Sequence, residues 1–213
     1  MNKIDIDIKK EITTFKYEEK ELHLFDKKDQ EVIYNVEENA TLKVYQYGIN
    51  INNDITINLN GNNAKVEYHY STINYENHKY NILVNHNVSN TYSNIYNHGI
   101  NVFDKKLDFN VTGKVFKNSD NCICNQENQI LNLVDGDSTI LPNLLIDNYN
   151  VSSSHSAYIG KFKDEILFYL MSRGLSRTIS YDLLIKSFLI NGSSRNEDIE
   201  SLEKEIKNIN EGD

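Results

Sequence analysis

The sequence contains no tryptophan, one proline and two cysteines, and it has fewer basic than acidic side chains. Its formal net charge of −9 argues against binding to nucleic acid or anionic lipid, because both need a basic face. No apolar run reaches the roughly 18–20 residues that span a bilayer. The N-terminus, MNKIDIDIKKE, alternates charge with isoleucine and lacks the apolar core of a signal peptide. These absences predict a cytoplasmic protein with no nucleic-acid or membrane partner.

The two cysteines, Cys122 and Cys124, are two residues apart, so in a strand they share one face. A reducing compartment predicts no disulfide between them. Iron–sulfur clusters are usually held by four thiolates, and free cysteine is a frequent core residue, so packing is favoured over metal ligation. A cluster shared between two copies of the chain is the arrangement in which both thiols would be metal ligands.

Residues 1 to about 150 repeat a period-two pattern in short pieces bounded by Asn, Asp, Gly or Ser, which is typical of strands and turns. The 32 asparagines fit an AT-rich genome, the interpretation given most weight, or polar turns with left-handed backbone. The spacing suits a sandwich, a barrel or a β-helix. The apolar pieces are Ile4–Ile6–Ile8, Leu22–Leu24, Leu42–Val44, Ile55–Ile57–Leu59, Val66–Tyr68–Tyr70, Ile82–Val84, Leu107–Phe109–Val111 and Leu131–Leu133.

Two details favour the β-helix among these three folds. Hairpin turn signals are absent between most adjacent pieces, with Asn60-Gly61-Asn62 and Asp135-Gly136-Asp137 as the exceptions. The single proline, Pro142, leaves few strand edges blunted in that way. Stacked coils are instead protected by covering their two ends, and a helical C-terminal segment would cover one of them.

After Gly160 the period becomes helical. Asp164 and Glu165 begin a first helix that Gly174 ends, and Ser176 caps a second helix that ends near Gly192. A third helix begins near Asn196. The apolar side of the second helix is expected to carry Ile179, Leu183, Leu184, Phe188 and Ile190. The chain is therefore divided into a β core, residues 1–160, and a helical domain, residues 161–213.

Several unusual residues occur here in a fixed order that resembles the C-terminal end of the SufB/SufD family, the scaffold proteins of iron–sulfur cluster assembly. The resemblance covers about residues 80–190 and is most specific in its C-terminal block. That block comprises Pro142-Asn143-Leu144-Leu145-Ile146, Val151-Ser152-Ser153-Ser154-His155, Ala157, Gly160, Phe168-Tyr169-Leu170 and Ser172-Arg173-Gly174.

The resemblance implies a right-handed parallel β-helix core with a C-terminal α-helical domain, in a short SufD-like member that lacks the N-terminal helical domain of larger relatives. It implies a homodimer, or a heterodimer with a SufB-like protein, formed at the C-terminal coils. It also implies that the helical domain binds a SufC-type ABC ATPase, so that ATP acts only through this partner and the chain is not itself an enzyme. The partner-binding residues are then expected among Phe168, Leu170, Met171, Arg173, Leu183 and Phe188.

His155 corresponds to the family's interface histidine, near which a transient iron–sulfur cluster would assemble. A neutral imidazole is a competent iron ligand, and the alternative is a histidine satisfied by neighbouring serine hydroxyls. Cys122 and Cys124 are the other candidate metal ligands, and we expect them two coils or so before His155.

The sequence departs from the family at two positions, which leaves other functions open. Many relatives have cysteine where Ser153 stands, and Ser156 replaces the Glu of SufB-like or the Gly of SufD-like members. One alternative is therefore an ATPase-binding interaction protein without cluster ligands. Another is a β-helix carbohydrate-binding or carbohydrate-active protein, suggested by the Asn, Asp and Tyr content and weakened by the lack of tryptophan.

Overall fold

The computed structural model describes residues 9–190 and 195–211. This part of the chain contains twelve strands followed by three helices. The expected strand at Ile4, Ile6 and Ile8 lies outside the described residues. The strands are β1 (Lys9–Phe15), β2 (Glu19–Asp26), β3 (Gln30–Val36), β4 (Thr41–Ile49), β5 (Asn53–Leu59), β6 (Lys65–Asn74), β7 (His78–His86), β8 (Tyr92–Asn101), β9 (Lys106–Val115), β10 (Cys122–Asn132), β11 (Asp137–Ile146) and β12 (Val151–Gly160).

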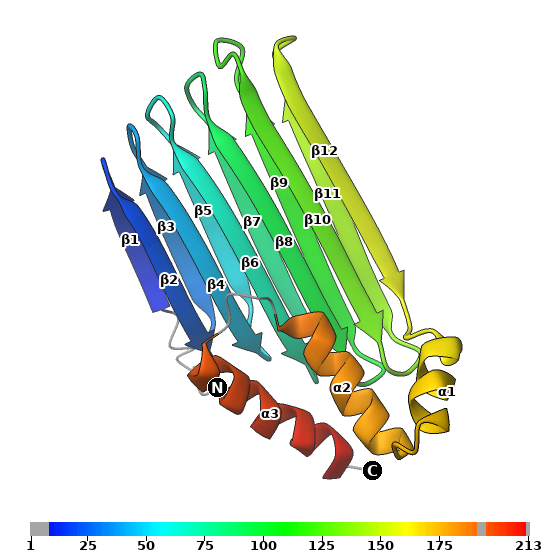
Figure 1. Ribbon diagram of the computed structural model, residues 1–213. Helices are drawn as coiled ribbons and strands as arrows, with labels where there is room; N and C mark the ends of the chain where they lie inside the picture. Colours follow the sequence, from blue (N-terminus) through cyan, green and yellow to red (C-terminus); the bar gives the residue numbers. More distant parts are fainter. Residues whose placement is uncertain (1–8, 191–194, 212–213) are drawn as a thin grey trace, which may run out of the picture.

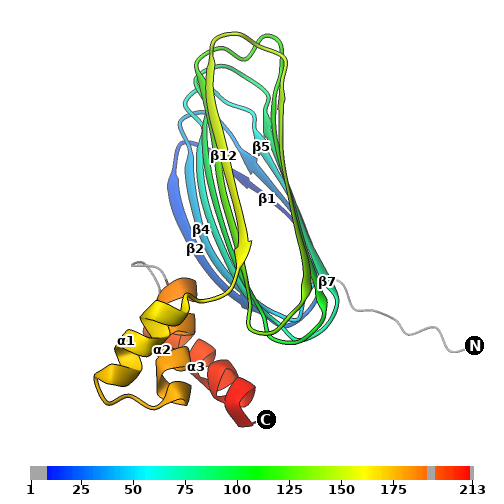
Figure 2. The ribbon, with the colours of Figure 1, turned by 90° about the vertical axis from the view of Figure 1, so that its right-hand side faces the viewer.

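The strands form two six-stranded sheets, and each sheet contains every second strand of the chain. The odd-numbered strands lie in the order β1-β3-β5-β7-β9-β11 and the even-numbered ones in the order β12-β10-β8-β6-β4-β2. All neighbouring strands within a sheet are parallel. The chain therefore winds in coils of one odd and one even strand, seen as two facing layers in Figures 1 and 2. This confirms the predicted β-helix and excludes the sandwich and the barrel.

The two hairpin signals of the sequence are corners between the sheets. Asn60-Gly61-Asn62 joins β5 to β6, and Asp135-Gly136-Asp137 lies where β10 gives way to β11. In both cases the flanking strands belong to different sheets. A turn signal predicts a reversal of the chain, and in this fold the reversal leads to the opposite layer instead of to a paired neighbour.

Apolar and aromatic side chains fill the space between the layers. Tyr70 stacks on Tyr80 with ring centroids 4.2 Å apart, and Phe109 meets Tyr80 edge-on at 5.4 Å. The buried Tyr68 hydroxyl donates to Gln46 Oε1 at 2.6 Å, so its polar end is satisfied. Aromatic pairs of this geometry add to the stabilisation from buried area, and they hold successive coils in register.

Asparagines line the turns that join odd to even strands. Asn39, Asn63, Asn90 and Asn121 occupy equivalent turns with φ of 54°, 62°, 59° and 55°. Asparagine tolerates this left-handed backbone better than other non-glycine residues. The side chains also bond from coil to coil: Asn121 Nδ2 donates to Asn90 Oδ1 at 3.2 Å, and Asn150 Nδ2 to Asn121 Oδ1 at 2.9 Å. Turn geometry and coil stacking therefore explain a substantial part of the asparagine content.

Three helices follow the last strand: α1 (Asp164–Ser172), α2 (Arg177–Leu189) and α3 (Asn196–Glu211). Gly174, with φ of 92°, lies in the turn after α1, where a side chain would be strained. Ser176 Oγ accepts a hydrogen bond from the Ile179 amide at 3.2 Å, which confirms the predicted cap of α2. The expected end of α2 at Gly192 lies outside the described residues.

The helices lie at the lower end of the even-numbered sheet, on its outer side (Figure 2). They share a second apolar core with the strands, in which Ile185 and Leu189 of α2 and Leu202 and Ile206 of α3 are buried. The apolar face predicted for α2 is partly wrong, because Ile179 and Leu183 are exposed. None of the described helices is long and apolar enough to cross a membrane.

Candidate functional site

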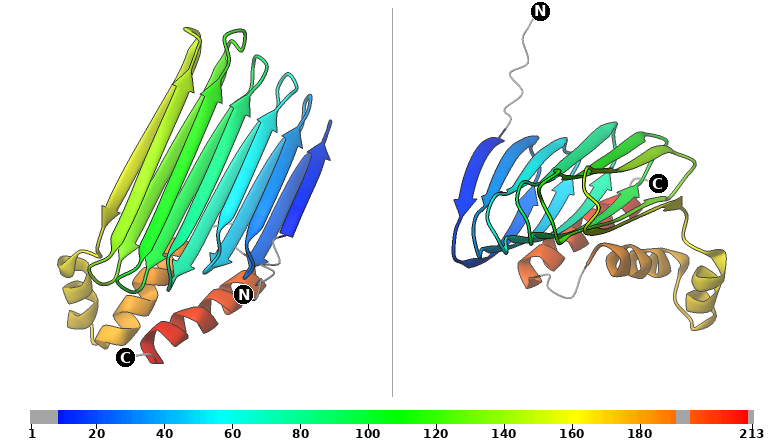
Figure 3. Two further views of the ribbon diagram at one scale, coloured as in Figure 1. Left: turned by 180° about the vertical axis from the view of Figure 1, so that it is seen from behind. Right: turned by 90° about the horizontal axis from the view of Figure 1, so that it is seen from above.

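The C-terminal coil, formed by β11 and β12, leaves one end of the β-helix open (Figures 1 and 3). Three residues of β12, Ser153, His155 and Ala157, pair with Cys124, Gln126 and Asn128 of β10. These β10 residues are buried in the interior. Because side chains alternate along a strand and paired residues share a face, the three β12 residues also face inward. No further strand covers them among the described residues, so His155 is exposed at the open end.

Among the inward-facing side chains of β12, His155 is the one that could bind a metal ion. Across the described residues, no group of three or more His, Cys, Asp or Glu side chains is arranged to hold a metal ion. Ser153 shares its inward face, whereas Ser156 points to the outer face of the sheet. One imidazole can contribute one bond to iron, so a cluster at this position needs ligands from another molecule.

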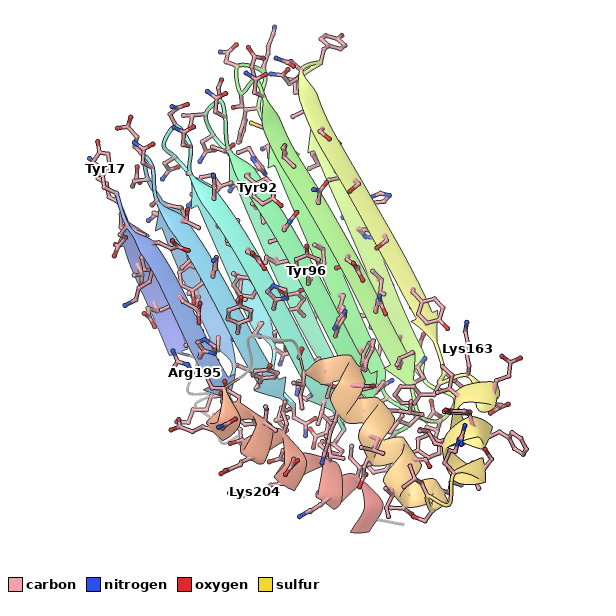
Figure 4. All side chains as sticks on the ribbon, viewed as in Figure 1. Tyr17, Tyr92, Tyr96, Lys163, Arg195 and Lys204 are labelled. Atoms are coloured by element: carbon pink, nitrogen blue, oxygen red, sulfur yellow. The ribbon has the colours of Figure 1, made fainter. Side chains whose placement is uncertain are left out.

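A polar hollow of about 380 Å³ is lined by the middle of β8, β10 and β12, and His155 and Gln126 are among its lining residues. Most of its other lining side chains lie on the outer face of the even-numbered sheet. Figure 4 shows Tyr96 projecting from this face. Glu127 is the single acidic residue of its lining, so the hollow lacks the carboxylate pair that glycosidases use. Its outward-facing side chains are Asn94, Tyr96, Asn125, Glu127, Ser154 and Ser156.

Cys122 and Cys124 are free, buried and inward-facing, which confirms the predicted common face. Cys122 Sγ lies 3.2 Å from both Thr91 Oγ1 and the Ser119 carbonyl oxygen. Burial raises the pKa of the Cys124 thiol, and a Cβ on Gly113 would lie 2.3 Å from its sulfur. Carbonyl acceptors and a raised pKa both favour the protonated thiol, whereas a metal needs thiolate. The local structure therefore fits packing better than ligation.

The expected separation of the cysteines from His155 is wrong. Cys124 pairs directly with Ser153, so the cysteines lie one coil before His155 and not two. A coil in this fold contains two strands and two turns, and it therefore uses more of the chain.

A buried imidazole adjoins the cysteines, and sequence reasoning did not assign it a role. His86 Nδ1 lies 2.8 Å from Thr91 Oγ1, and its Nε2 lies 2.9 Å from Ser93 Oγ. Burial lowers the pKa of His86 to about 4. Ser93 also bonds Cys124. The Thr91 and Ser93 hydroxyls satisfy both ring nitrogens of neutral His86, which fits a structural role for this buried histidine.

The neutral state of His86 predicts acid-sensitive folding. Its pKa is about 4 in the folded chain against an ordinary value of 6.5, so between these pH values the unfolded chain binds the extra proton. Stability is therefore complete above pH 6.5 and falls as the pH drops towards 4, by about 3 kcal/mol for this group. Urea unfolding at about pH 7 and about pH 4.5 measures the loss.

The acid loss should be smaller in His86→Gln and unchanged in His78→Gln, because His78 is only half-buried and bonds Asn74. Equal acid sensitivity in wild type and His86→Gln would contradict this assignment.

The remaining histidines have local partners. His69 Nε2 lies 2.8 Å from Glu67 Oε1, and the ring stacks between Tyr45 and Tyr96. His98 stacks on Phe188 of α2 at 4.7 Å between centroids. Together with the Ser71 hydroxyl, which donates to the Leu189 carbonyl at 2.8 Å, this contact fixes the end of α2 against the sheet.

The first two helices present an exposed apolar surface. Of the expected partner-binding residues, Phe168, Met171, Arg173 and Leu183 are exposed, whereas Leu170 is half-buried and Phe188 packs on His98. The Arg173 guanidinium lies over the Tyr169 ring at 5.2 Å. Ile166, Tyr169 and Ile179 are also exposed, and the sequence did not predict them as partner-binding residues. An estimate of which side of each helix faces solvent could have found them. We call the exposed apolar set the hairpin surface: Ile166, Phe168, Tyr169, Met171, Ile179 and Leu183.

The sequence is similar to a known protein family and to several individual proteins. Residues 11–188 match the family described as SUF system FeS cluster assembly, SufBD core domain. The chain is 34% identical over 98 residues to the iron–sulfur cluster assembly protein SufD of Bacillus subtilis, which is 45% of this chain and 22% of that protein. It is 45% identical over 49 residues to an iron–sulfur cluster assembly SufBD family protein of Archaeoglobus fulgidus, which is 23% of this chain and 13% of that relative. A Pyrococcus horikoshii protein of that family is 58% identical over 36 residues, which is 17% of this chain and 8% of that relative.

Proposed function

Because the chain belongs to the SufBD core domain family of iron–sulfur cluster assembly, we propose that it is a scaffold component that acts with a SufC-type ABC ATPase. In this proposal two β-helix cores meet at the open C-terminal coil, with His155 at their interface. The iron–sulfur cluster is the cargo of this site. The observation that carries the proposal is an inward-facing, exposed imidazole at the open end of a family β-helix.

The two ends of the β-helix differ in charge, which favours pairing through the C-terminal one. Inward-pointing charged side chains disfavour pairing of an exposed sheet edge with another chain. The first coil carries Glu11, Lys20 and Asp26 opposite interior positions of the next strands. The inward side chains of β12 have no fixed charge: they are Val151, Ser153, His155, Ala157 and Ile159.

A second core would complete the site that His155 begins. It is another copy of this chain or a SufB-like relative with additional ligands. His155 lies near the middle of β12, so two cores joined at this strand would enclose the imidazole between them. Such enclosure limits access of water and oxidants to a bound cluster, because solvent exposure is one of the protein's controls on cluster chemistry.

The hairpin surface is the proposed ATPase-binding surface. Exposed apolar residues on adjacent helices mark protein interaction sites. Movement of the ATPase would reach the core through α2, because Phe188 and Leu189 contact His98 on β8 and Ser71 on β6. Both strands belong to the sheet that ends at β12. Closure of the ATPase would thereby shift the open end of the β-helix.

An ATPase-binding protein without cluster ligands is the second candidate. Ser153 and Ser156 stand on either side of His155, both thiols are buried, and Cys122 contacts hydroxyl and carbonyl oxygens. In this second candidate the hairpin surface still binds the ATPase, and a second core supplies every cluster ligand.

Anaerobic reconstitution separates the two candidates. The chain, the ATPase and the second core are incubated with iron and sulfide, and bound cluster is measured by visible absorption and iron content. We expect His155→Ala to lose most of the bound iron, because it removes the one ligand that this chain contributes. His78→Ala is the matched control and should retain wild-type iron. Full iron retention in His155→Ala would contradict a ligand role and favour the second candidate.

A further inference from the structure

We propose that the polar hollow over β8, β10 and β12 binds an arginine side chain from a partner protein, with its guanidinium stacked on Tyr96 and paired with Glu127. Tyr96 of β8 and Glu127 of β10 are register partners, and both line the hollow. This binding needs neither a cluster nor the ATPase, so the proposal goes beyond the proposed function and does not depend on it.

Tyr96, labelled in Figure 4, ends a ladder of stacked rings on the outer face of the sheet. The centroids of Tyr45 and His69 are 5.0 Å apart, and those of His69 and Tyr96 are 4.6 Å apart. The next residue of this row is Glu127, which has no ring and a shorter side chain. Because the ladder spacing is close to the strand separation of about 4.8 Å, a planar group over β10 would stack on Tyr96 in the same way.

The charge of the hollow favours a cation. Among the described residues that line it, Glu127 is the one acidic residue, and none is a lysine or an arginine. Gln129 Nε2 donates to Glu127 Oε1 at 2.7 Å, which holds the carboxylate on the outer face without neutralising it. Burial is the largest cause that raises the pKa of the Tyr96 hydroxyl, and nearby acidic groups, Glu127 among them, raise it further. A positive group would therefore be stabilised beside this ring.

A guanidinium fits these groups better than an ammonium. It is planar, stacks on aromatic faces and pairs with a carboxylate through two parallel N–H donors, whereas an ammonium is a compact and strongly hydrated charge. A row of amide oxygens lies beside Glu127. Asn94 Oδ1 accepts from Asn125 at 3.1 Å, and Asn125 Oδ1 accepts from Ser154 at 2.8 Å. Each amide oxygen has a second lone pair, which can accept another guanidinium N–H.

The arginine is expected to come from a different protein. This chain has three arginines, all in the helical domain. Arg173 lies over the Tyr169 ring at 5.2 Å, and Arg177 lies over the Tyr181 ring at 5.7 Å, so two of the three already stack within their own chain. A net charge of −9 favours a basic partner. Free arginine is a poorer fit, because no described lysine or arginine in the lining could pair with its α-carboxylate.

Binding of blocked arginine, Nα-acetyl-arginine methylamide, tests the site, because it presents the side chain as a polypeptide does. Backbone NMR shifts of β8, β10 and β12 follow the titration at low ionic strength. Blocked lysine should bind more weakly, and blocked citrulline, which keeps the shape and lacks the charge, about tenfold more weakly. Glu127→Gln and Tyr96→Leu should each weaken binding of blocked arginine by about fivefold, the value of one exposed ion pair or cation–π contact.

Matched variants control for indirect effects. Tyr96→Phe keeps the ring and should bind as the wild type does. Glu21→Gln should also leave binding unchanged, because Glu21 bonds His23 on the outer face of β2, at the other end of the sheet. Glu127→Gln keeps the shape of the side chain, so it tests the site even if Tyr96→Leu fails to fold.

Two results would overturn the proposal. Equal binding of blocked arginine and blocked citrulline, or wild-type binding in Glu127→Gln, would exclude a guanidinium site in this hollow. Free arginine that binds about tenfold more tightly than the blocked form would show recognition of the amino acid backbone, and it would exclude a side chain of a partner protein as the natural ligand.

Discussion

Replacing Phe168 by glutamate is expected to weaken capture of the proposed ATPase partner by about 100-fold, equivalent to about 2.7 kcal/mol. Phe168 is 74% exposed on α1, so the substitution should leave the fold intact. At a bound interface the same carboxylate would be desolvated without a partner, which is strongly unfavourable. Affinity of the purified ATPase for wild-type and variant chains, measured by titration, gives the difference.

Two further variants test whether the hairpin surface is responsible for the loss of affinity. Leu183→Glu on α2 should act in the same direction, because Leu183 belongs to the same hairpin surface. Ile12→Glu is the matched control, since Ile12 is 71% exposed on β1 at the opposite end of the β-helix. Point variants are preferable to deletion of the helices, because α2 and α3 cover Tyr47, Ile49 and Ile73 of the core. Wild-type affinity in the Phe168→Glu, Leu183→Glu double variant would rule out this surface.

Replacing Ala157 by arginine is expected to prevent pairing of the cores. Ala157 faces inward on β12, the strand that ends the even-numbered sheet. A guanidinium without a partner in an enclosed interface costs about 3–5 kcal/mol, which corresponds to more than a 100-fold loss of affinity. Sedimentation of the chain alone and with a SufB-like protein measures the mass of each assembly.

Ile12→Arg places the same side chain on the first coil and should leave pairing unchanged. The opposite pattern, with Ile12→Arg dissociating the cores and Ala157→Arg leaving them paired, would move the interface to the N-terminal coil. Loss of pairing in both variants would point to a general effect of charge instead of a specific interface.

The β-helix could be predicted from the sequence because its evidence is local. Alternating residues such as Val66, Tyr68 and Tyr70 and the scarcity of hairpin signals are properties of short segments. Helical spacing after Gly160 predicted the helices, and the C-terminal block ending in Ser172-Arg173-Gly174 indicated the family. The cap at Ser176 followed from residue type alone, since a serine hydroxyl is suited to the free amides of a helix start.

The errors concern quantities that depend on the register between coils. The distance from Cys124 to His155 was wrong, because the length of a coil follows from where the turns fall. For α2, helical spacing predicted an apolar face around Ile179 and Leu183, whereas packing on the sheet selected Ile185 and Leu189. Residue type predicts the elements, and long-range packing determines their faces and neighbours.

The most direct test is native mass spectrometry of the chain purified without oxygen from its own cells through an affinity tag. We expect an iron-containing assembly of two β-helix cores and an ABC ATPase. His155→Ala should lose that iron and retain the same subunits. A chain recovered as a monomer without ATPase, or equal iron in the wild type and His155→Ala, would contradict this expectation.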